Sequence, residues 1–262
     1  MVEKPFTPTF EEADELVKLA EKHDVLLTVY QNRRWDVDFL TLRKHIEDGT
    51  LGRIVEFETH FDRYRPDPPP MTWKAVPNPG TGAAYDLGTH LMDQVVHLFG
   101  LPKRITGFIG SQRASNPTGL EDSCTILLHY EGMLATVKAG VVSAEVNQLR
   151  YWVRGEKGNW KKYHLDPQED QLKRGIKPGD EGYGIESEDK SAVLEVLKDG
   201  KFARSTVQQV EPATYVEFYR KLAKALKGDV NELPVDPAEA AQLIRLVELA
   251  RQSSKEGKTL EV

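Results

Sequence analysis

Two carboxylates and two imidazoles recur at helical spacing in residues 80–100 of the sequence. A glycine-rich lead-in, an apolar-periodic run and a closing Gly100 predict one helix there, starting near Asp86 and ending near Phe99. At about 3.6 residues per turn, the titratable residues share one stripe of this helix: Asp86, His90, Asp93 and His97. The apolar residues lie on the other side and predict a core-facing surface: Leu87, Leu91, Val95, Leu98 and Phe99.

This stripe has three interpretations. The first is a solvated face with Asp86 as the N-cap, although four titratable residues without a Lys or Arg are less typical of such a face. The second is a metal site, because zinc accepts His and Asp ligands one turn apart. The third is general acid–base chemistry, in which His90 transfers a proton and Asp86 orients the ring or sets its pKa. Spacing alone does not separate the last two.

The composition is that of a globular protein, with 262 residues, 39% hydrophobic and 8% aromatic, enough for one large domain or two smaller ones. A net charge of −6 and scattered Lys and Arg argue against a nucleic-acid partner. Cys124 is the only cysteine, so no internal disulfide can form, and it lies in an apolar alternation typical of core. No apolar run is long enough for a membrane helix or a signal peptide, so we expect a soluble, cytoplasmic protein.

Helical patterns occur at four other places, and one apolar run precedes the second of them. Thr9 followed by Glu12 is a capping box, and Asp236 with Pro237 is typical of a cap and first turn. The expected helices open at residue 9 and span residues 36–47, 215–226 and 237–251. Residues 25–30 predict a strand buried on both faces, and residues 31–35 follow at its carboxyl end, where open α/β sheets bind ligands.

Period-two alternation dominates the rest and predicts a sheet. The expected strands are residues 53–62, 104–113, 123–130, 133–142, 148–154 and 159–163. Residues 66–73 are proline-rich and predict a loop that can act as a lid, with Trp73 as its anchor or as a substrate contact. Residues 166–184 are polar and glycine-rich and predict a further loop. The order predicts an α+β fold, a large, mainly antiparallel open sheet with helices on one face.

Several short motifs occur in a defined order along the chain. They are Glu3-Lys4-Pro5, Asn32-Arg33-Arg34-Trp35-Asp36, Gly52-Arg53-Ile54 and Asp86-Leu87-Gly88-Thr89-His90. In this order and spacing the chain resembles the Gfo/Idh/MocA family of NAD(P)-dependent oxidoreductases, which includes glucose–fructose oxidoreductase and the inositol dehydrogenases. Two further runs are similar to the branch that contains NADP-dependent scyllo-inositol dehydrogenases: Asp62-Arg63-Tyr64-Arg65-Pro66 and Asp166-Pro167-Gln168-Glu169.

The resemblance implies catalytic roles for three residues. In the family, the Lys of Glu-Lys-Pro and the Asp and His of the helix motif surround the carbon that gives up hydride, and the Lys-Pro bond is commonly cis. Carried over, these are Lys4, Asp86 and His90, with Lys4 and Pro5 also beside the cofactor. Alcohol oxidation removes a hydride and a proton, so a base must contact the hydroxyl. We expect His90 to be that base, Lys4 to bond the same oxygen and Asp86 to support the imidazolium.

The resemblance also implies substrate contacts. Asn32 and Arg33 match positions that contact substrate in inositol dehydrogenases, although a strand-end Arg is as often a structural ion-pair partner. Arg63 and Trp73 are further expected substrate contacts. Asp93 and His97 are interpreted as packing residues or as supports for the site, and no metal ligand set is assigned.

The N-terminal part of the chain departs from the family pattern. Family members carry a Rossmann domain before Glu-Lys-Pro, with a G-x-G-x-x-G turn for the pyrophosphate, and no such turn occurs in this sequence. We therefore expect residues 1–31 to be a remnant of the end of a Rossmann domain. Residues 32–262 are expected to form the substrate-binding and oligomerisation domain. NADP or NAD is the expected cofactor of full-length relatives, but this chain is expected to be truncated, to bind it weakly and to be inactive alone.

Three functions remain open at this point. The first is an oxidoreductase acting on a sugar or polyol, and the second is a non-catalytic binding or assembly protein that kept the family's substrate domain. A metal-dependent sugar isomerase or lyase is the third. In each case we expect a homo-oligomer, because strands 123–130 and 133–142 carry apolar residues on both alternating sets, and large exposed apolar patches mark interfaces. The family commonly dimerises through this sheet, which the resemblance extends to this chain.

Overall fold

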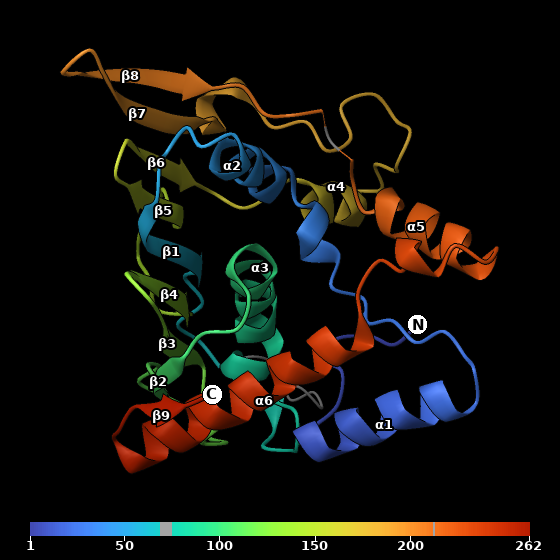
Figure 1. The fold of residues 1–262 in the computed structure, drawn as a ribbon. Helices are drawn as coiled ribbons and strands as arrows, with labels where there is room; N and C mark the ends of the chain where they lie inside the picture. Colours follow the sequence, from blue (N-terminus) through green and yellow to red (C-terminus); the bar gives the residue numbers. More distant parts are fainter. Residues whose placement is uncertain (69–74, 212) are drawn as a thin grey trace.

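The computed structural model describes residues 1–68, 75–211 and 213–262, and within them nine strands form one open sheet (Figure 1). The strands are β1 Ile54–Asp62, β2 Arg104–Gly110, β3 Ser123–Tyr130, β4 Met133–Gly140, β5 Leu149–Gly155, β6 Gly158–Tyr163, β7 Ala192–Lys198, β8 Lys201–Val207 and β9 Leu260–Glu261. Their order is β8-β7-β6-β5-β1-β4-β3-β2-β9, in which β1 and β4 run parallel and all other neighbours antiparallel. The expected α+β fold with a mainly antiparallel open sheet is confirmed.

Helices cover one face of this sheet. They are α1 Phe10–Lys22, α2 Val37–Glu47, α3 Thr89–Phe99, α4 Gln168–Lys173, α5 Val216–Leu226 and α6 Pro237–Glu256. Figure 1 shows α2, α3 and α6 on the same side of the strands. The sequence signals for their ends are confirmed at α1, where Thr9 and Glu12 form a capping box, and at α6, where Asp236 caps and Pro237 opens the first turn.

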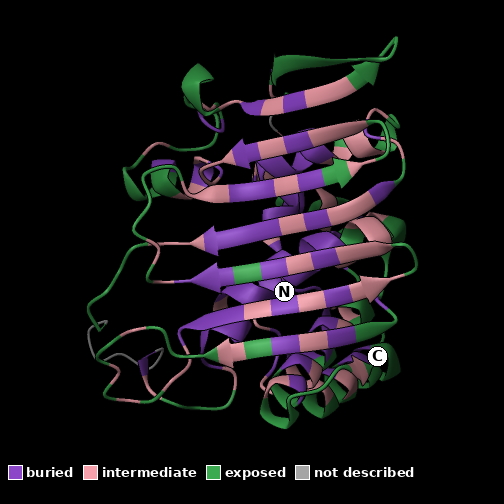
Figure 2. Ribbon diagram, turned by 90° about the vertical axis from the view of Figure 1, so that its left-hand side faces the viewer, coloured by how far each residue is buried: buried purple, intermediate pink, exposed green. Residues whose placement is uncertain are grey.

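The core lies between the sheet and these helices. Inward-facing side chains such as Phe57, Ile126 and Val137 are fully buried against α3 and α6 residues such as Leu91 and Leu246. Figure 2 looks onto the other face, where buried positions alternate with half-buried and exposed ones along many of the strands, whereas β8 at the edge is almost entirely exposed. This alternation follows from the period of two in a strand, which sends successive side chains to opposite faces.

A second core holds the first residues of the chain. Phe6, Val17 and Val29 pack with Phe218 of α5 and Ile244 of α6. The predicted strand over residues 25–30 is wrong, because only Val29 bridges a neighbour, Val2, in parallel, and Val25 is 59% exposed. A strand requires a ladder of hydrogen bonds, and the described residues supply two bonds here, Val2 N to Thr28 O and Tyr30 N to Val2 O.

Two other expectations need correction. Residues 166–184 are not entirely loop, because α4 forms within them, and the β7–β8 hairpin was not predicted. The expected lid at residues 66–73 and its Trp73 fall largely on residues 69–74, which lie outside the described residues. No described helix combines the length and apolar character that crossing a membrane requires.

Candidate active site

The helix that carries Asp86 and His90 opens with an unusual turn. Residues Ala84–Gly88 form one π-helical turn, and α3 continues from Thr89. Such turns are frequent at functional sites. The N-cap of this turn is therefore Ala83 and not Asp86. The lead-in requires glycine at Gly82, whose φ is +102° and where a Cβ would lie 2.2 Å from the Glu121 carboxylate.

Lys4 meets Asp86 on this turn. The Nζ of Lys4 donates to the main-chain oxygen of Asp86 at 2.5 Å and to its Oδ1 at 3.0 Å. The Lys4 side chain is 14% exposed and that of Asp86 is 46% exposed, so the pair lies at a surface with one carboxylate accessible. The Lys4–Pro5 bond is cis, as the resemblance implied.

His90 lies one turn further along and is buried. Its ring is 7% exposed and its centroid lies 6.2 Å from that of Phe61. Its Nδ1 is buried without a hydrogen-bond partner among the described residues. Burial, and then the positive charges of Lys4, Arg33, Arg150 and Arg63, hold the pKa of His90 well below its ordinary value. The imidazole is therefore neutral at neutral pH and able to accept a proton.

Buried arginines surround this imidazole. The guanidinium of Arg150 donates to Asp38 Oδ2 at 3.0 Å and to Gln94 Oε1 at 2.9 Å, and it lies 4.6 Å from the centre of the Phe61 ring. Gln94 Nε2 in turn donates to the main-chain oxygen of Arg33 at 2.8 Å. This network links β5, α2 and α3 to the segment that holds Arg33.

Arg33 has protein partners on both sides of its guanidinium. It donates to the Tyr215 hydroxyl at 3.1 Å and forms an ion pair with Glu169 of α4. Although burial raises the pKa of Glu169, Arg33 and Lys173 lower it to about 2, so Glu169 stays ionised. Arg33 therefore acts as a structural ion-pair partner, which was one of the two roles considered for it from the sequence. The neighbouring Asn32 is half-buried at the start of the short 3₁₀ helix Asn32–Trp35.

The other half of the titratable stripe is structural. Asp93 is fully buried and accepts hydrogen bonds from Arg34, from Nε at 2.9 Å to Oδ2 and at 3.2 Å to Oδ1, and from Nη2 at 2.7 Å to Oδ1. His97 packs beside Phe39, with ring centroids 6.3 Å apart. The stripe is therefore not a solvated face, and its four residues do not converge. Across residues 1–68, 75–211 and 213–262, no group of three or more His, Cys, Asp or Glu side chains is arranged to hold a metal.

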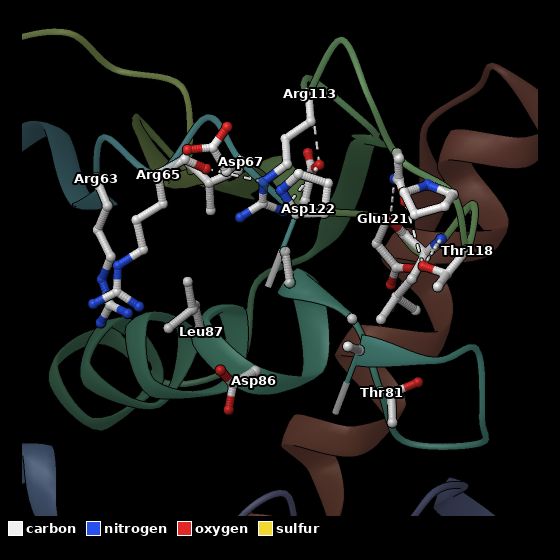
Figure 3. A pocket seen from close by; sticks show the side chains of 18 of the residues that line it. Arg63, Arg65, Asp67, Thr81, Asp86, Leu87, Arg113, Thr118, Glu121 and Asp122 are labelled. Carbon is white, nitrogen blue, oxygen red and sulfur yellow. Dashed lines mark hydrogen bonds and ion pairs between the residues drawn. The ribbon is translucent and has the colours of Figure 1, made fainter. Parts of the chain in front are cut away.

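A cleft of about 430 Å³ opens beside Lys4 and Asp86 (Figure 3). This volume lies in the usual range for small-molecule sites. Its walls come from residues 63–68 after β1, from residues 80–87, and from residues 113–122 between β2 and β3. Among the expected site residues, its lining includes Lys4, Pro5, Arg63 and Asp86. Asn32, Arg33 and His90 are not part of the lining, and Trp73 lies outside the described residues.

Three supporting residues were not assigned to the site from the sequence. Glu169 and Tyr215 hold Arg33, and Arg150 connects Asp38 with Gln94. Only Glu169 had a signal, since it lies in the motif Asp166-Pro167-Gln168-Glu169. Tyr215 and Arg150 come from an ordinary helix start and an ordinary strand, and no local pattern distinguishes them.

Comparisons with known proteins identify the family of the chain. The family model described as oxidoreductase family, C-terminal alpha/beta domain, matches residues 43–262. An uncharacterized oxidoreductase of Schizosaccharomyces pombe is 38% identical over 272 residues, which cover 99% of this chain and 74% of that protein. The scyllo-inositol 2-dehydrogenase (NADP(+)) IolW of Bacillus subtilis is 36% identical over 260 residues, covering 99% of this chain and 71% of IolW. The solved structure of YvaA from Bacillus subtilis matches with a TM-score of 0.93 and 36% identity, covering 100% of this chain and 73% of that one.

Proposed function

We propose, from the premise that the chain belongs to the Gfo/Idh/MocA family of oxidoreductases, that it acts in NAD(P)-dependent oxidation of a hydroxyl on a sugar or polyol. One observation carries the proposal: Lys4 binds Asp86 at the wall of a cleft, one turn before the buried, neutral His90. The name of IolW makes an inositol-like polyol and NADP the first candidates.

The cleft suits the nicotinamide end of a dinucleotide better than its pyrophosphate end. Pro5 and Leu87 offer apolar surface beside the polar Lys4 and Asp86, and this surface suits a nicotinamide ring. When bound, the nicotinamide accepts the hydride from the substrate carbon. The pyrophosphate end has no matching feature, because no G-x-G-x-x-G turn occurs in the 262 residues.

Residues of the chain remove the proton of the substrate hydroxyl. In the proposal the substrate hydroxyl extends past the lining of the cleft to lie between Lys4 Nζ and the buried His90 ring, and the neutral imidazole accepts the hydroxyl proton. Lys4 Nζ donates a hydrogen bond to the same oxygen and stabilises its developing negative charge. Asp86 keeps Lys4 in place and offsets the positive charge that forms on His90, which the surrounding arginines otherwise disfavour.

The test is polyol binding and turnover by the chain. Ligand-observed NMR should detect scyllo-inositol bound to the 262-residue chain and show weaker binding by the Lys4→Met and Asp86→Asn variants. With NADP⁺ at millimolar concentration, any formation of NADPH should be lost in His90→Asn. The exposed Arg204→Gln on β8 is the matched control, because its side chain is 72% exposed and distant from the cleft in the sheet order. Equal binding and turnover by all variants would rule out the assignment.

A second candidate is a binding or assembly protein without redox chemistry. The position of His90 outside the lining of the cleft favours it, because a general base must contact the hydroxyl that it deprotonates. The two candidates differ in one measurement. A binding protein takes up the polyol with no dependence on NADP⁺ and forms no NADPH at any cofactor concentration.

A further inference from the structure

Two arginine side chains on one wall of the cleft lack a carboxylate partner. Arg63 and Arg65 follow directly after β1 and line the cleft, and neither forms an ion pair with any described residue. Residues 69–74 and 212 contain no Asp or Glu, so they supply no carboxylate either. Figure 3 shows both guanidinium groups reaching from the β1 side toward the turn that carries Asp86 and Leu87.

Arg63 is half-buried and Arg65 is exposed, and both differ from the more buried arginines of this region. Each of the others has an acidic side chain within ion-pair distance: Arg33 with Glu169, Arg34 with Asp93, Arg113 with Asp122 and Arg150 with Asp38. Of the acidic residues that line the cleft, Asp67 is exposed and forms no ion pair among the described residues, and the others pair with cations other than Arg63 and Arg65. Asp86 accepts from Lys4, and Glu121 pairs with Arg251.

The two guanidinium groups lie close enough to repel each other. Burial, followed by the charge of Arg65, lowers the pKa of Arg63 from its ordinary value. Two like charges beside each other, here a half-buried and an exposed guanidinium, repel each other, and an anion bound between them removes this repulsion. Glu169 and Asp86 act on Arg63 and raise its pKa, but no described carboxylate lies within ion-pair distance of either guanidinium, so a ligand oxyanion would supply the direct partner.

The backbone holds both arginines in position. Arg63 N donates to Gly140 O at 2.9 Å and Arg65 N donates to Val141 O at 2.7 Å, both at the end of β4. Ser143 N donates back to Arg63 O at 2.9 Å. Because β1 and β4 are parallel, their carboxyl ends meet here and fix the direction from which the two side chains enter the cleft. The site is therefore built by the sheet and not by a free loop.

We propose that the substrate of this cleft carries an oxyanion, a carboxylate or a phosphate ester, which Arg63 and Arg65 bind together. The inference rests on the proposed function and narrows it from a neutral polyol to a sugar acid or a sugar phosphate. A guanidinium fork binds either group through two parallel hydrogen bonds. The anionic end lies on the β1 wall, and the hydroxyl to be oxidised lies at the Lys4 and Asp86 end of the same cleft.

Three sugars with the same ring test this inference by isothermal titration against the 262-residue chain: D-glucose, D-glucuronate and D-glucose 6-phosphate. We expect at least one anionic sugar to bind about tenfold more tightly than D-glucose, the effect of one hydrogen bond to a charged group. That ratio should fall toward one in Arg63→Gln and Arg65→Gln and at high salt, and should stay unchanged in Arg204→Gln. Comparison of D-glucuronate with D-glucose 6-phosphate separates the two oxyanions.

The outcomes distinguish this inference from the function on which it rests. If D-glucose binds as tightly as both anionic sugars, the inference is wrong and the proposed function stands. If none of the three binds, both are wrong. If Arg63→Gln and Arg65→Gln weaken NADPH binding and leave the sugar ratio unchanged, the anion belongs to the cofactor and the inference is overturned. Arg65 is exposed, so Arg65→Gln keeps the test valid should Arg63→Gln fail to fold, which a thermal melt detects.

Discussion

The Nζ of Lys4 donates to both the main-chain oxygen and the Oδ1 of Asp86, which lies 82 residues later in the sequence. The start of the chain is therefore joined to the π-helical turn that opens the central helix. This contact brings together the two sequence motifs on which the proposed chemistry depends. Experiments can separate a catalytic from a stabilising role of this contact, because the first affects the rate of oxidation and the second affects the free energy of unfolding.

Replacing Lys4 with Met should reduce polyol oxidation much more than stability. Loss of one donor to a developing oxyanion typically costs about 10²–10³ in turnover. The ion pair contributes less than about 1 kcal/mol to the free energy of unfolding, because Asp86 is 46% exposed and water screens the pair. NADPH formation and urea unfolding measure the two effects. Lys18→Met, which removes an exposed pair with Asp14 on α1, is the matched control and should change neither.

The pH dependence of oxidation should report His90. Burial and the neighbouring cations hold its pKa well below the ordinary 6.5, and the neutral ring is the active form. Activity should therefore be fully present above pH 6.5 and should fall only as the pH drops through the lowered pKa. The measurement is kcat/KM against pH, made on the chain fused to a G-x-G-x-x-G strand–turn–helix unit ahead of Met1, because the chain alone is expected to bind the cofactor weakly. Burial also lowers the pKa of His97, to about 4, so His97→Asn is the control. This variant should leave the loss of activity at low pH unchanged. A loss of activity near pH 6.5 in the parent chain would contradict the assignment of His90.

Replacing Arg150 with Met should destabilise the fold strongly. The side chains of Arg150 and Asp38 are both 0% exposed, so removing the guanidinium leaves a buried carboxylate without its partner. Such changes cost about 3–5 kcal/mol in the free energy of unfolding. Arg53→Met is the control, because Arg53 and Glu156 are both more than half exposed and the loss should stay below about 1 kcal/mol. Equal midpoints for the two variants in urea would contradict this account.

Local patterns predicted the elements, but not the long-range partners of the site. The capping box at Thr9 and the strand β1 were predicted from a few consecutive residues, and both are confirmed. The stripe of Asp86, His90, Asp93 and His97 was grouped by spacing alone. The structure divides it, because Arg34, the partner of Asp93, lies 59 residues earlier.

The β7–β8 hairpin was missed for a related reason. It lies at the edge of the sheet, and six of the seven residues of β8 are exposed, so no apolar alternation marks it. Glu169 was quoted in a motif but was not assigned to the site, because its partner Arg33 lies 136 residues away and comes from a different element. Sequence periodicity reports which face of an element is buried. It does not report which distant charge completes a pair.

The sheet face away from the helices should mediate self-association. Leu127 and Leu134 alternate with the buried Leu128 and Ala135, so they point outward, and both are half-buried in the single chain. Light scattering at micromolar concentration should give a mass above the 29.6 kDa monomer. The double variant Leu127→Glu, Leu134→Glu should return the mass to the monomer value, because buried charges oppose association. Leu226→Glu, on the exposed side of α5, should not, and a monomeric parent chain would contradict the prediction.

NADPH should bind the 262-residue chain weakly. A dinucleotide is held mainly through its pyrophosphate, by backbone amides of a G-x-G-x-x-G turn and the helix N-terminus behind it, and this sequence contains no such turn. The loss of two hydrogen bonds to charged groups, at about 1.5 kcal/mol each, corresponds to more than about 100-fold in affinity. Titration of NADPH fluorescence measures this, with a fusion that carries a G-x-G-x-x-G strand–turn–helix unit ahead of Met1 as the comparison. The fusion should bind about 100-fold more tightly, whereas equal, tight binding by both would mean that residues 1–262 hold the pyrophosphate themselves.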